Sequence, residues 1–209
     1  MKALLELPET WHVVVNDENR ELLEQWKFGK INTELMKDGC VVGMYKWKSK
    51  IFAKEYNDKY KTVIDEKAAF FAENKTKATK TPSGLQYIIL EKGLGKKPAT
   101  GTPIYIHYAG FFESGMLFDS SIETVATTFG KFDEVRKAQG GYAPIGFQAG
   151  KKDGMIPGFI EGIEQLSFGD RALIFIPSNL AYGEGGAGEV IPPNTPLIFE
   201  ITLLEKPNN

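Results

Sequence analysis

Short runs of apolar residues, bordered by glycine and proline, recur through the second half of the chain. Four of them read LQYIILEKG, TPIYIHYAGFF, DRALIFIPS and PLIFEITLLE. They are rich in β-branched and aromatic residues, which favour extended strands, and their Gly and Pro borders favour turns. The pattern predicts a twisted antiparallel sheet beyond Ser83.

One short helix interrupts these strands, in the segment IPGFIEGIEQLSFG. Pro157 suits its first turn, where the missing N–H has no intrahelical partner, and Gly169 suits a stop. The helix carries an apolar stripe made of Phe159, Ile160, Ile163 and Leu166. A sheet that curls around this helix would bury the stripe, which indicates an α+β domain.

A longer helical pattern precedes the sheet. Apolar residues recur at helical spacing from Phe52 to Phe71, and the lysine-rich segment KTKATKTPSG (75–84) then marks a solvated boundary. Residues 51–80 are interpreted as an amphipathic linker or docking helix. A helix lying on a membrane is disfavoured because its acidic residues dilute the basic face: Asp58, Asp65, Glu66 and Glu73.

Residues 1–50 form a small α+β segment of unknown role in this interpretation. WHVVV and CVVGMYKWK resemble strands, and NRELLEQW between them resembles a helix. Three units are therefore expected: 1–50, 51–80 and a β-rich domain at 81–209. A fragment that starts near residue 80 is expected to fold alone.

Composition narrows the function classes. The net charge is −2, which gives no overall reason to expect nucleic acid as a partner. The single Cys40 excludes an internal disulfide, and no Cys/His cluster is spaced to hold zinc. Glu6, Pro8 and Glu9 interrupt the first apolar residues, so neither a secretory signal nor a membrane span is expected, and the chain is predicted to be cytoplasmic.

Three separated blocks carry a resemblance to a known family. They read YIHYAGFFESGMLFDSS, GMIPGFIEGIEQLSFGDRALIFIPSNLAYG and GEVIPPNTPLIFEITLLE. Together, over about residues 83–206, they closely resemble the FKBP-type peptidyl-prolyl cis-trans isomerases. The resemblance implies a five-stranded antiparallel sheet wrapped on one short helix. It also implies that the protein accelerates rotation about Xaa-Pro bonds without a cofactor or metal, by favouring the twisted amide in a dry aromatic pocket.

Matching these motifs residue by residue gives the expected site. The residues expected to be catalytic are Tyr108, Phe118, Asp119, Ile156 and Tyr182. Those expected to bind substrate are Met155, Phe159, Ala181, Val190, Ile191, Phe199 and Ile145. The implied partners are proline-containing peptides, unfolded proteins and macrolide inhibitors of the rapamycin type. Taken singly, the aromatic residues would suit any core and Asp119 any turn, while His107 should face away from Tyr108 in an alternating strand.

Two segments shape the expected site further. AYGEGGAGEVIPP would be a loop over the pocket in which Gly183, Gly185, Gly186 and Gly188 permit positive φ. Residues 122–146 form a longer connection than the compact members have, with a helical turn around FDEVRKAQ, and they leave open whether Arg136 reaches Asp119. Ile145 and Ala187 replace usual pocket residues, so macrolides should bind more weakly.

Two readings remain. The first is an active isomerase whose N-terminal region docks substrates or a second copy, which would give a homodimer. The alternative is a binding module of the same fold with weak or no activity.

Overall fold

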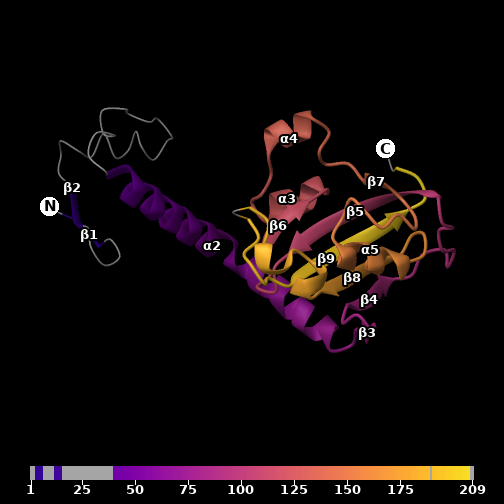
Figure 1. The fold of residues 1–209 in the computed structure, drawn as a ribbon. Helices are drawn as coiled ribbons and strands as arrows, with labels where there is room; N and C mark the ends of the chain where they lie inside the picture. The colour runs from indigo at the N-terminus through magenta and orange to yellow at the C-terminus, as the bar shows by residue number, and fades with distance from the viewer. Residues whose placement is uncertain (1–2, 7–11, 16–39, 189, 208–209) are drawn as a thin grey trace. The chain divides into compact units, whose positions relative to one another are not determined.

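The computed structural model describes residues 3–6, 12–15, 40–188 and 190–207, with side chains at 56, 58–188 and 190–207. The chain divides into two units, Met1–Lys59 and Tyr60–Asn209. The first contains an antiparallel hairpin of β1 (Ala3–Glu6) and β2 (His12–Val15) and the start of helix α2 (Cys40–Lys75) (Figure 1).

The elements predicted for the first 80 residues are only partly confirmed. The strand at WHVVV is confirmed by β2, but the strand expected at CVVGMYKWK is wrong, because these residues lie in α2. A helix satisfies backbone hydrogen bonds within itself, whereas a strand needs a partner. The helix expected at NRELLEQW lies outside the described residues. Helix α2 also ends at Lys75 rather than 80, since Thr79–Lys80 pair with the next strand.

The second unit is built on one antiparallel sheet with the order β3-β4-β8-β9-β5-β6, and β7 pairs with β5 as well. The strands are β3 (Thr79–Lys80), β4 (Gln86–Glu91), β5 (Pro103–Phe111), β6 (Leu117–Ser120), β7 (Ile145–Gln148), β8 (Arg171–Ile176) and β9 (Leu197–Leu204). The predicted α+β fold with an antiparallel sheet is confirmed. Seven strands form instead of five because β3 adds a short edge and both β6 and β7 pair with β5.

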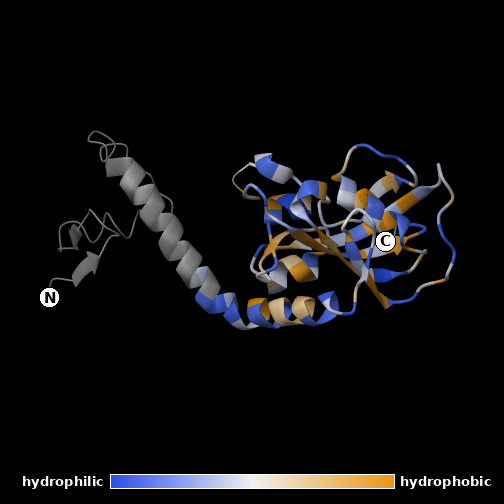
Figure 2. Ribbon diagram, turned by 60° about the horizontal axis from the view of Figure 1, so that its bottom comes forward, coloured by the Kyte–Doolittle hydropathy of each residue, from blue (hydrophilic) through white to orange (hydrophobic). Residues whose placement is uncertain are grey.

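Helix α5 (Pro157–Glu164) covers one face of this sheet, and we call that face the inner face (Figure 1). Gly158 and Gly162 allow the close approach, since a Cβ on either would lie 2.3 Å from a side-chain atom of Ile176 or Ile174 on β8. Figure 2 shows hydrophobic residues along the central strands and hydrophilic residues in the surrounding loops. The predicted apolar stripe of α5 is confirmed as core, with Phe159, Ile160 and Ile163 between 4% and 5% exposed.

The last turns of α2 pack on the opposite, outer face. Phe71 is 2% exposed, and its ring lies 5.2 Å from that of Phe111 on β5. Lys67 Nζ donates to Glu200 Oε2 of β9 at 2.6 Å. In the β5–β6 turn, a Cβ on Gly115 would lie 2.1 Å from the carbonyl oxygen of Ile64. Residues 60–75 are therefore part of the second unit.

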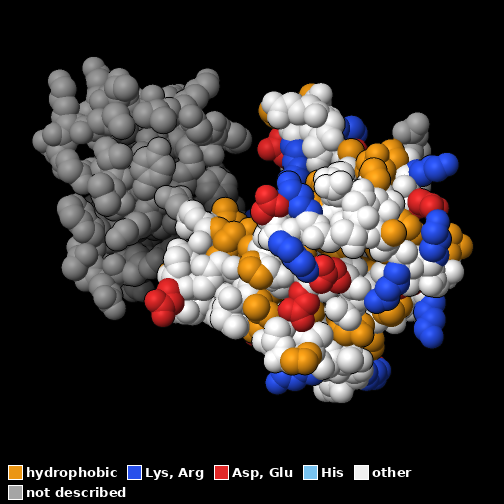
Figure 3. All heavy atoms as spheres, turned by 45° about the vertical axis from the view of Figure 1, so that its right-hand side comes forward, with side chains coloured by type: hydrophobic (Ala, Val, Ile, Leu, Met, Phe, Trp, Pro, Cys, Tyr) orange, Lys and Arg blue, Asp and Glu red, His pale blue; other side chains and the backbone are white. Residues whose placement is uncertain are grey.

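The remaining elements lie in connections. The long one holds α3 (Glu123–Thr128) and α4 (Glu134–Ala138), which confirms the helical turn predicted around FDEVRKAQ. Asp133 caps α4 by accepting the Arg136 N–H at 2.9 Å, and Gly140 follows with φ of 72°. Two 3₁₀ turns, η2 (Ser178–Leu180) and η3 (Gly183–Gly185), precede β9. On the face drawn in Figure 3, both signs of charge occur side by side with hydrophobic side chains among them.

Candidate active site

Aromatic rings on the inner face form the floor of the candidate site. Phe159 of α5 and Phe199 of β9 meet edge to face, with ring centroids 4.9 Å apart. Tyr108 of β5 lies 6.3 Å from Phe159, and Phe118 of β6 lies 5.6 Å from Phe199. Phe159 and Phe199 are buried, whereas Tyr108 and Phe118 are half-buried. The sheet and helix therefore present an apolar aromatic surface that is partly open.

Gly110 on β5 creates the space for this cluster. A Cβ there would lie 2.5 Å from the Phe118 ring and 3.0 Å from the Phe199 ring. The sequence reasoning gave this glycine no role. Its signal was available, because glycine inside a strand often marks a close approach of another group.

Phe112 is a second residue that was missed. Its ring centroid lies 5.2 Å from that of Phe118 and widens the aromatic wall. Because Phe112 directly follows β5, its direction does not follow from strand alternation, and only the structure shows it.

A hydrogen-bonded polar group borders the rings. Tyr108 donates its hydroxyl proton to Asp119 Oδ2 at 2.5 Å. The other carboxylate oxygen accepts from the Ser120 N–H at 2.9 Å and from Arg136 Nη1. Burial and the adjacent carboxylate raise the pKa of Tyr108 to about 12, so this hydroxyl keeps its proton at neutral pH. The question that the sequence left open is answered: Arg136 reaches Asp119.

The start of α5 forms the next edge of the site. Ile156 precedes the helix in an extended conformation (φ −61°, ψ 143°), and its carbonyl accepts from the Phe159 N–H at 3.0 Å. Within the described part of the chain, the Ile156 N–H has no acceptor. Met155 and Ile156 are half-buried and pack against the core. A free N–H beside a helix N-terminus is suited to bind a carbonyl oxygen.

The loop after β8 supplies the last edge. Ala181 is half-buried against the core, while Tyr182 is 43% exposed. Across the described residues, the Tyr182 hydroxyl forms no hydrogen bond, so it is available to a ligand. Ile191 is buried at 5% exposure, but Val190 is 59% exposed. Val190 is therefore the one predicted substrate-binding residue, among those the structure describes, that does not pack against the core.

This loop folds back on itself as a tight turn. Ala187 and Ile191 exchange backbone hydrogen bonds of 2.8 and 3.1 Å. Gly186 has φ of 63°, and a Cβ there would lie 2.4 Å from the Ile191 carbonyl oxygen. Positive φ is confirmed at Gly183, Gly186 and Gly188. Gly185, in the 3₁₀ turn η3, is not among the glycines with positive φ.

Two further predicted positions lie on β5 and β7. Ile145 pairs with Ile106 across the strands, so it shares the inner face with Tyr108 and is half-buried against the core. His107 makes its contact with Ser121 Oγ, at 3.1 Å from Nδ1, and Ser121 is 1% exposed. The structural role expected of His107 fits this burial, which also lowers its pKa.

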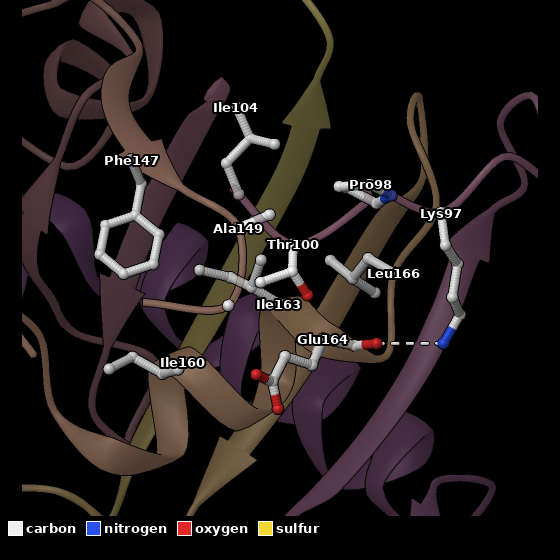
Figure 4. Close-up of a pocket in the computed structure, with 11 residues that line it drawn as sticks. Lys97, Pro98, Thr100, Ile104, Phe147, Ala149, Ile160, Ile163, Glu164 and Leu166 are labelled. Atoms are coloured by element: carbon white, nitrogen blue, oxygen red, sulfur yellow. Dashed lines mark hydrogen bonds between the residues drawn. The ribbon is translucent and has the colours of Figure 1, made fainter. Parts of the chain in front are cut away.

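A separate cavity of about 240 Å³ lies between the later turns of α5, β5 and β7 (Figure 4). Its apolar lining includes Ile104, Phe147 and Ile163, and Lys97 Nζ donates to the Glu164 carbonyl at its rim at 3.0 Å. None of the predicted site residues lines it. The candidate site is therefore assigned to the aromatic cluster, where the free donors are.

No group of three or more His, Cys, Asp or Glu in the described ranges could hold a metal ion. None of the described helices is both long and apolar enough to span a bilayer.

Fold and site together define a class of protein: an antiparallel sheet wrapped on one helix, with a partly open aromatic cluster that has hydrogen-bond donors near it. Comparison with known proteins gives the family. Residues 95–204 match the FKBP-type peptidyl-prolyl cis-trans isomerase family, and the chain belongs to it.

Curated relatives agree with this assignment. The chain is 39% identical over 139 residues to the probable FKBP-type peptidyl-prolyl cis-trans isomerase FkpA of Neisseria meningitidis, covering 66% of this chain and 44% of the relative. It is 34% identical over 149 residues to the FKBP-type 22 kDa isomerase of Escherichia coli, covering 70% and 63%. It is 32% identical over 179 residues to the outer membrane protein MIP of Legionella longbeachae, covering 83% and 66%. The chain thus spans less than two thirds of each of these relatives.

Proposed function

We propose that this chain is an active peptidyl-prolyl cis-trans isomerase that accelerates rotation about Xaa-Pro bonds in proline-containing peptides and unfolded proteins. The observation that carries the proposal is an apolar aromatic floor with two donors that have no partner among the described residues, the Ile156 N–H and the Tyr182 hydroxyl. Family membership supports the same activity.

The geometry suits this chemistry because amide rotation needs neither a nucleophile nor a metal. The barrier of about 18–20 kcal/mol arises from resonance that the twisted amide has lost. When a proline ring binds against Phe159 and Phe199, it is transferred from water to an apolar surface. On that surface the less dipolar twisted amide is favoured over the planar amide. The Ile156 N–H and the Tyr182 hydroxyl would bind substrate carbonyl oxygens on either side of the proline.

Asp119 would act on the rotating bond by electrostatics. Its carboxylate borders the rings, and both of its oxygens are held by hydrogen bonds from Tyr108, Ser120 and Arg136. A carboxylate fixed in this way can favour one orientation of the rotating carbonyl dipole without moving itself.

The experiment is an isomerisation assay on a short Xaa-Pro peptide, followed by exchange spectroscopy so that no protease is needed. Wild type should accelerate the exchange between the cis and trans forms, and Asp119→Leu should reduce that acceleration. If the wild type binds the peptide but leaves the exchange rate unchanged, the alternative holds and the domain is a binding module.

Several finer assignments remain proposals. The aromatic floor supports binding of rapamycin-type macrolides, which calorimetry and competition with the peptide test. A homodimer through the N-terminal region is tested by light scattering of the full chain.

A cytoplasmic location is tested by cell fractionation. The isomerase domain is proposed to begin near Tyr60, because residues 60–75 pack on its sheet.

A further inference from the structure

Arg136 is held at three places besides its own backbone. Its Nη1 donates to Asp119, and its Nε donates to the Gly141 carbonyl at 3.1 Å. Its guanidinium carbon lies 5.2 Å from the ring centroid of Tyr142. The arginine therefore bridges the pocket carboxylate and the end of the long connection, with an aromatic ring against it.

Tyr142 also fixes the segment from which Arg136 projects. Its hydroxyl oxygen accepts the Asp133 N–H at 2.9 Å, and the Asp133 carboxylate accepts the Arg136 N–H at 2.9 Å. The Tyr142 ring stacks on Phe132, with centroids 5.7 Å apart and planes 13° apart. One tyrosine thus contacts both the start of α4 and the side chain that leaves it.

This support matters because Arg136 has a long side chain that is 34% exposed. A side chain of this kind loses rotamer freedom when it is held in one geometry, and the loss lowers the gain from its ion pair. The ring of Tyr142 and the carbonyl of Gly141 restrict the guanidinium before any substrate binds. The ion pair with Asp119 then costs less to form.

We infer that Tyr142 is a positioning residue of the isomerase site, which acts by holding Arg136 so that Arg136 holds Asp119 in its working orientation. The inference rests on the proposed isomerase function. It gives the long connection at 122–146 a role: this segment delivers and fixes a basic partner for the pocket carboxylate.

The test is a double-mutant cycle in the full chain with Tyr142→Leu, Arg136→Leu and the two combined. Tyr142→Leu should lower kcat/KM by about three- to tenfold, which is the size of a lost cation–π and hydrogen-bond contribution. Tyr142→Phe keeps the ring against Arg136 and loses only the hydrogen bond from the Asp133 N–H, so it should lower kcat/KM less than Tyr142→Leu does. In the Arg136→Leu background, Tyr142→Leu should produce no further loss, since residues that act through one another are not additive.

Two measurements separate positioning from loss of fold. Val135→Ala, on the same helix but 65% exposed, serves as the matched control and should leave kcat/KM unchanged. The Arg136 Nε–H resonance, which the bond to Gly141 protects from exchange, should be visible in wild type and Tyr142→Phe and lost in Tyr142→Leu. Arg136→Lys, which keeps the charge without the planar fork, should resemble Arg136→Leu and covers the case in which Tyr142→Leu fails to fold.

The outcomes are distinct. If Tyr142→Leu lowers kcat/KM by the same factor with and without Arg136, or if the Nε–H signal survives it, Tyr142 does not act through Arg136 and the inference is overturned. If the wild type itself isomerises no peptide, the proposed function fails, and the resonance experiment still decides whether Tyr142 positions Arg136.

Discussion

Replacing Phe71 by alanine tests whether the last turns of α2 belong to the core of the isomerase domain. Phe71 is 2% exposed, and its ring meets the fully buried Phe111 at 5.2 Å. Removing a buried phenylalanine side chain costs about 3–5 kcal/mol, because the lost contacts leave a cavity. Domains of this kind are stable by about 5–15 kcal/mol in total, so the variant should lose a large part of its stability.

Urea denaturation of the full chain, followed by circular dichroism, measures this loss. Leu94→Ala is the matched control, since Leu94 is 77% exposed and its truncation should change stability by no more than about 0.5 kcal/mol. Isomerase activity of the folded Phe71→Ala protein should stay near that of wild type, because Phe71 lies on the outer face, away from the aromatic floor. A loss of stability below about 1 kcal/mol would show that the helix merely rests on the sheet.

The packing of Phe71 on the outer face also changes which fragment of the chain we expect to fold alone. A fragment that begins near residue 80 keeps every predicted pocket residue but lacks Phe71, Ile64 and Lys67. It would expose the buried Phe111. The helical pattern up to Phe71 predicted a docking helix without showing which surface it covers. A fragment that begins at Tyr60 keeps the helix turns that cover the outer face, and it should unfold at a higher urea concentration than the shorter one.

Three further changes probe the site. Tyr182→Phe should lower kcat/KM through one lost neutral hydrogen bond, worth about 0.5–1.5 kcal/mol, with an unchanged urea midpoint; an unchanged kcat/KM would place the substrate elsewhere. Phe159→Ala should weaken peptide binding and lower stability by about 3–5 kcal/mol, because this ring belongs both to the aromatic floor and to the core. Peptide calorimetry measures the binding and urea titration measures the stability, and normal values in both would contradict both roles. The raised pKa of Tyr108, about 12, predicts that stability is retained below pH 10 and falls as pH rises from about 10 to 12, since the unfolded tyrosine ionises first. Tyr108→Phe should remove this part of the alkaline loss in urea titrations at pH 9 and 11, and an identical loss in both proteins would mean that another group is responsible.

The parts of the fold that the sequence predicted have strong local signals. Alternating strands and the stripe on α5 follow from residue pattern alone, and both are confirmed. The segment CVVGMYKWK has residues that favour strands, yet it is helical in the structure. Local propensity is a weak prior where no partner strand pairs with the segment.

The strands and the helix that carry Tyr108, Phe159 and Phe199 were predictable from local pattern, but only the resemblance to the family assigned these side chains to the site. The Arg136–Asp119 pair was left open by both, because it depends on the path of the connection from 122 to 146, which has no regular period. The role of Val190 stays a prediction: it lies in a tight turn, where adjacent residues differ sharply in exposure.

Strand β9 joins the two faces of the domain through adjacent residues. Phe199 packs in the aromatic floor on the inner face, and Glu200 lies on the outer face. There Glu200 accepts from Lys67 and from Arg171, each at 2.6 Å, while it is only 20% exposed. A slip of one residue in the pairing of β9 would exchange the two faces, bringing a carboxylate into the apolar floor, removing the partner of Lys67 and leaving Arg171 with Glu91 alone. The ion pair between Lys67 of α2 and Glu200 therefore disfavours the same register shift of β9 that burial of Phe199 disfavours. Residues 60–75 thus help to fix the register of the strand that carries Phe199.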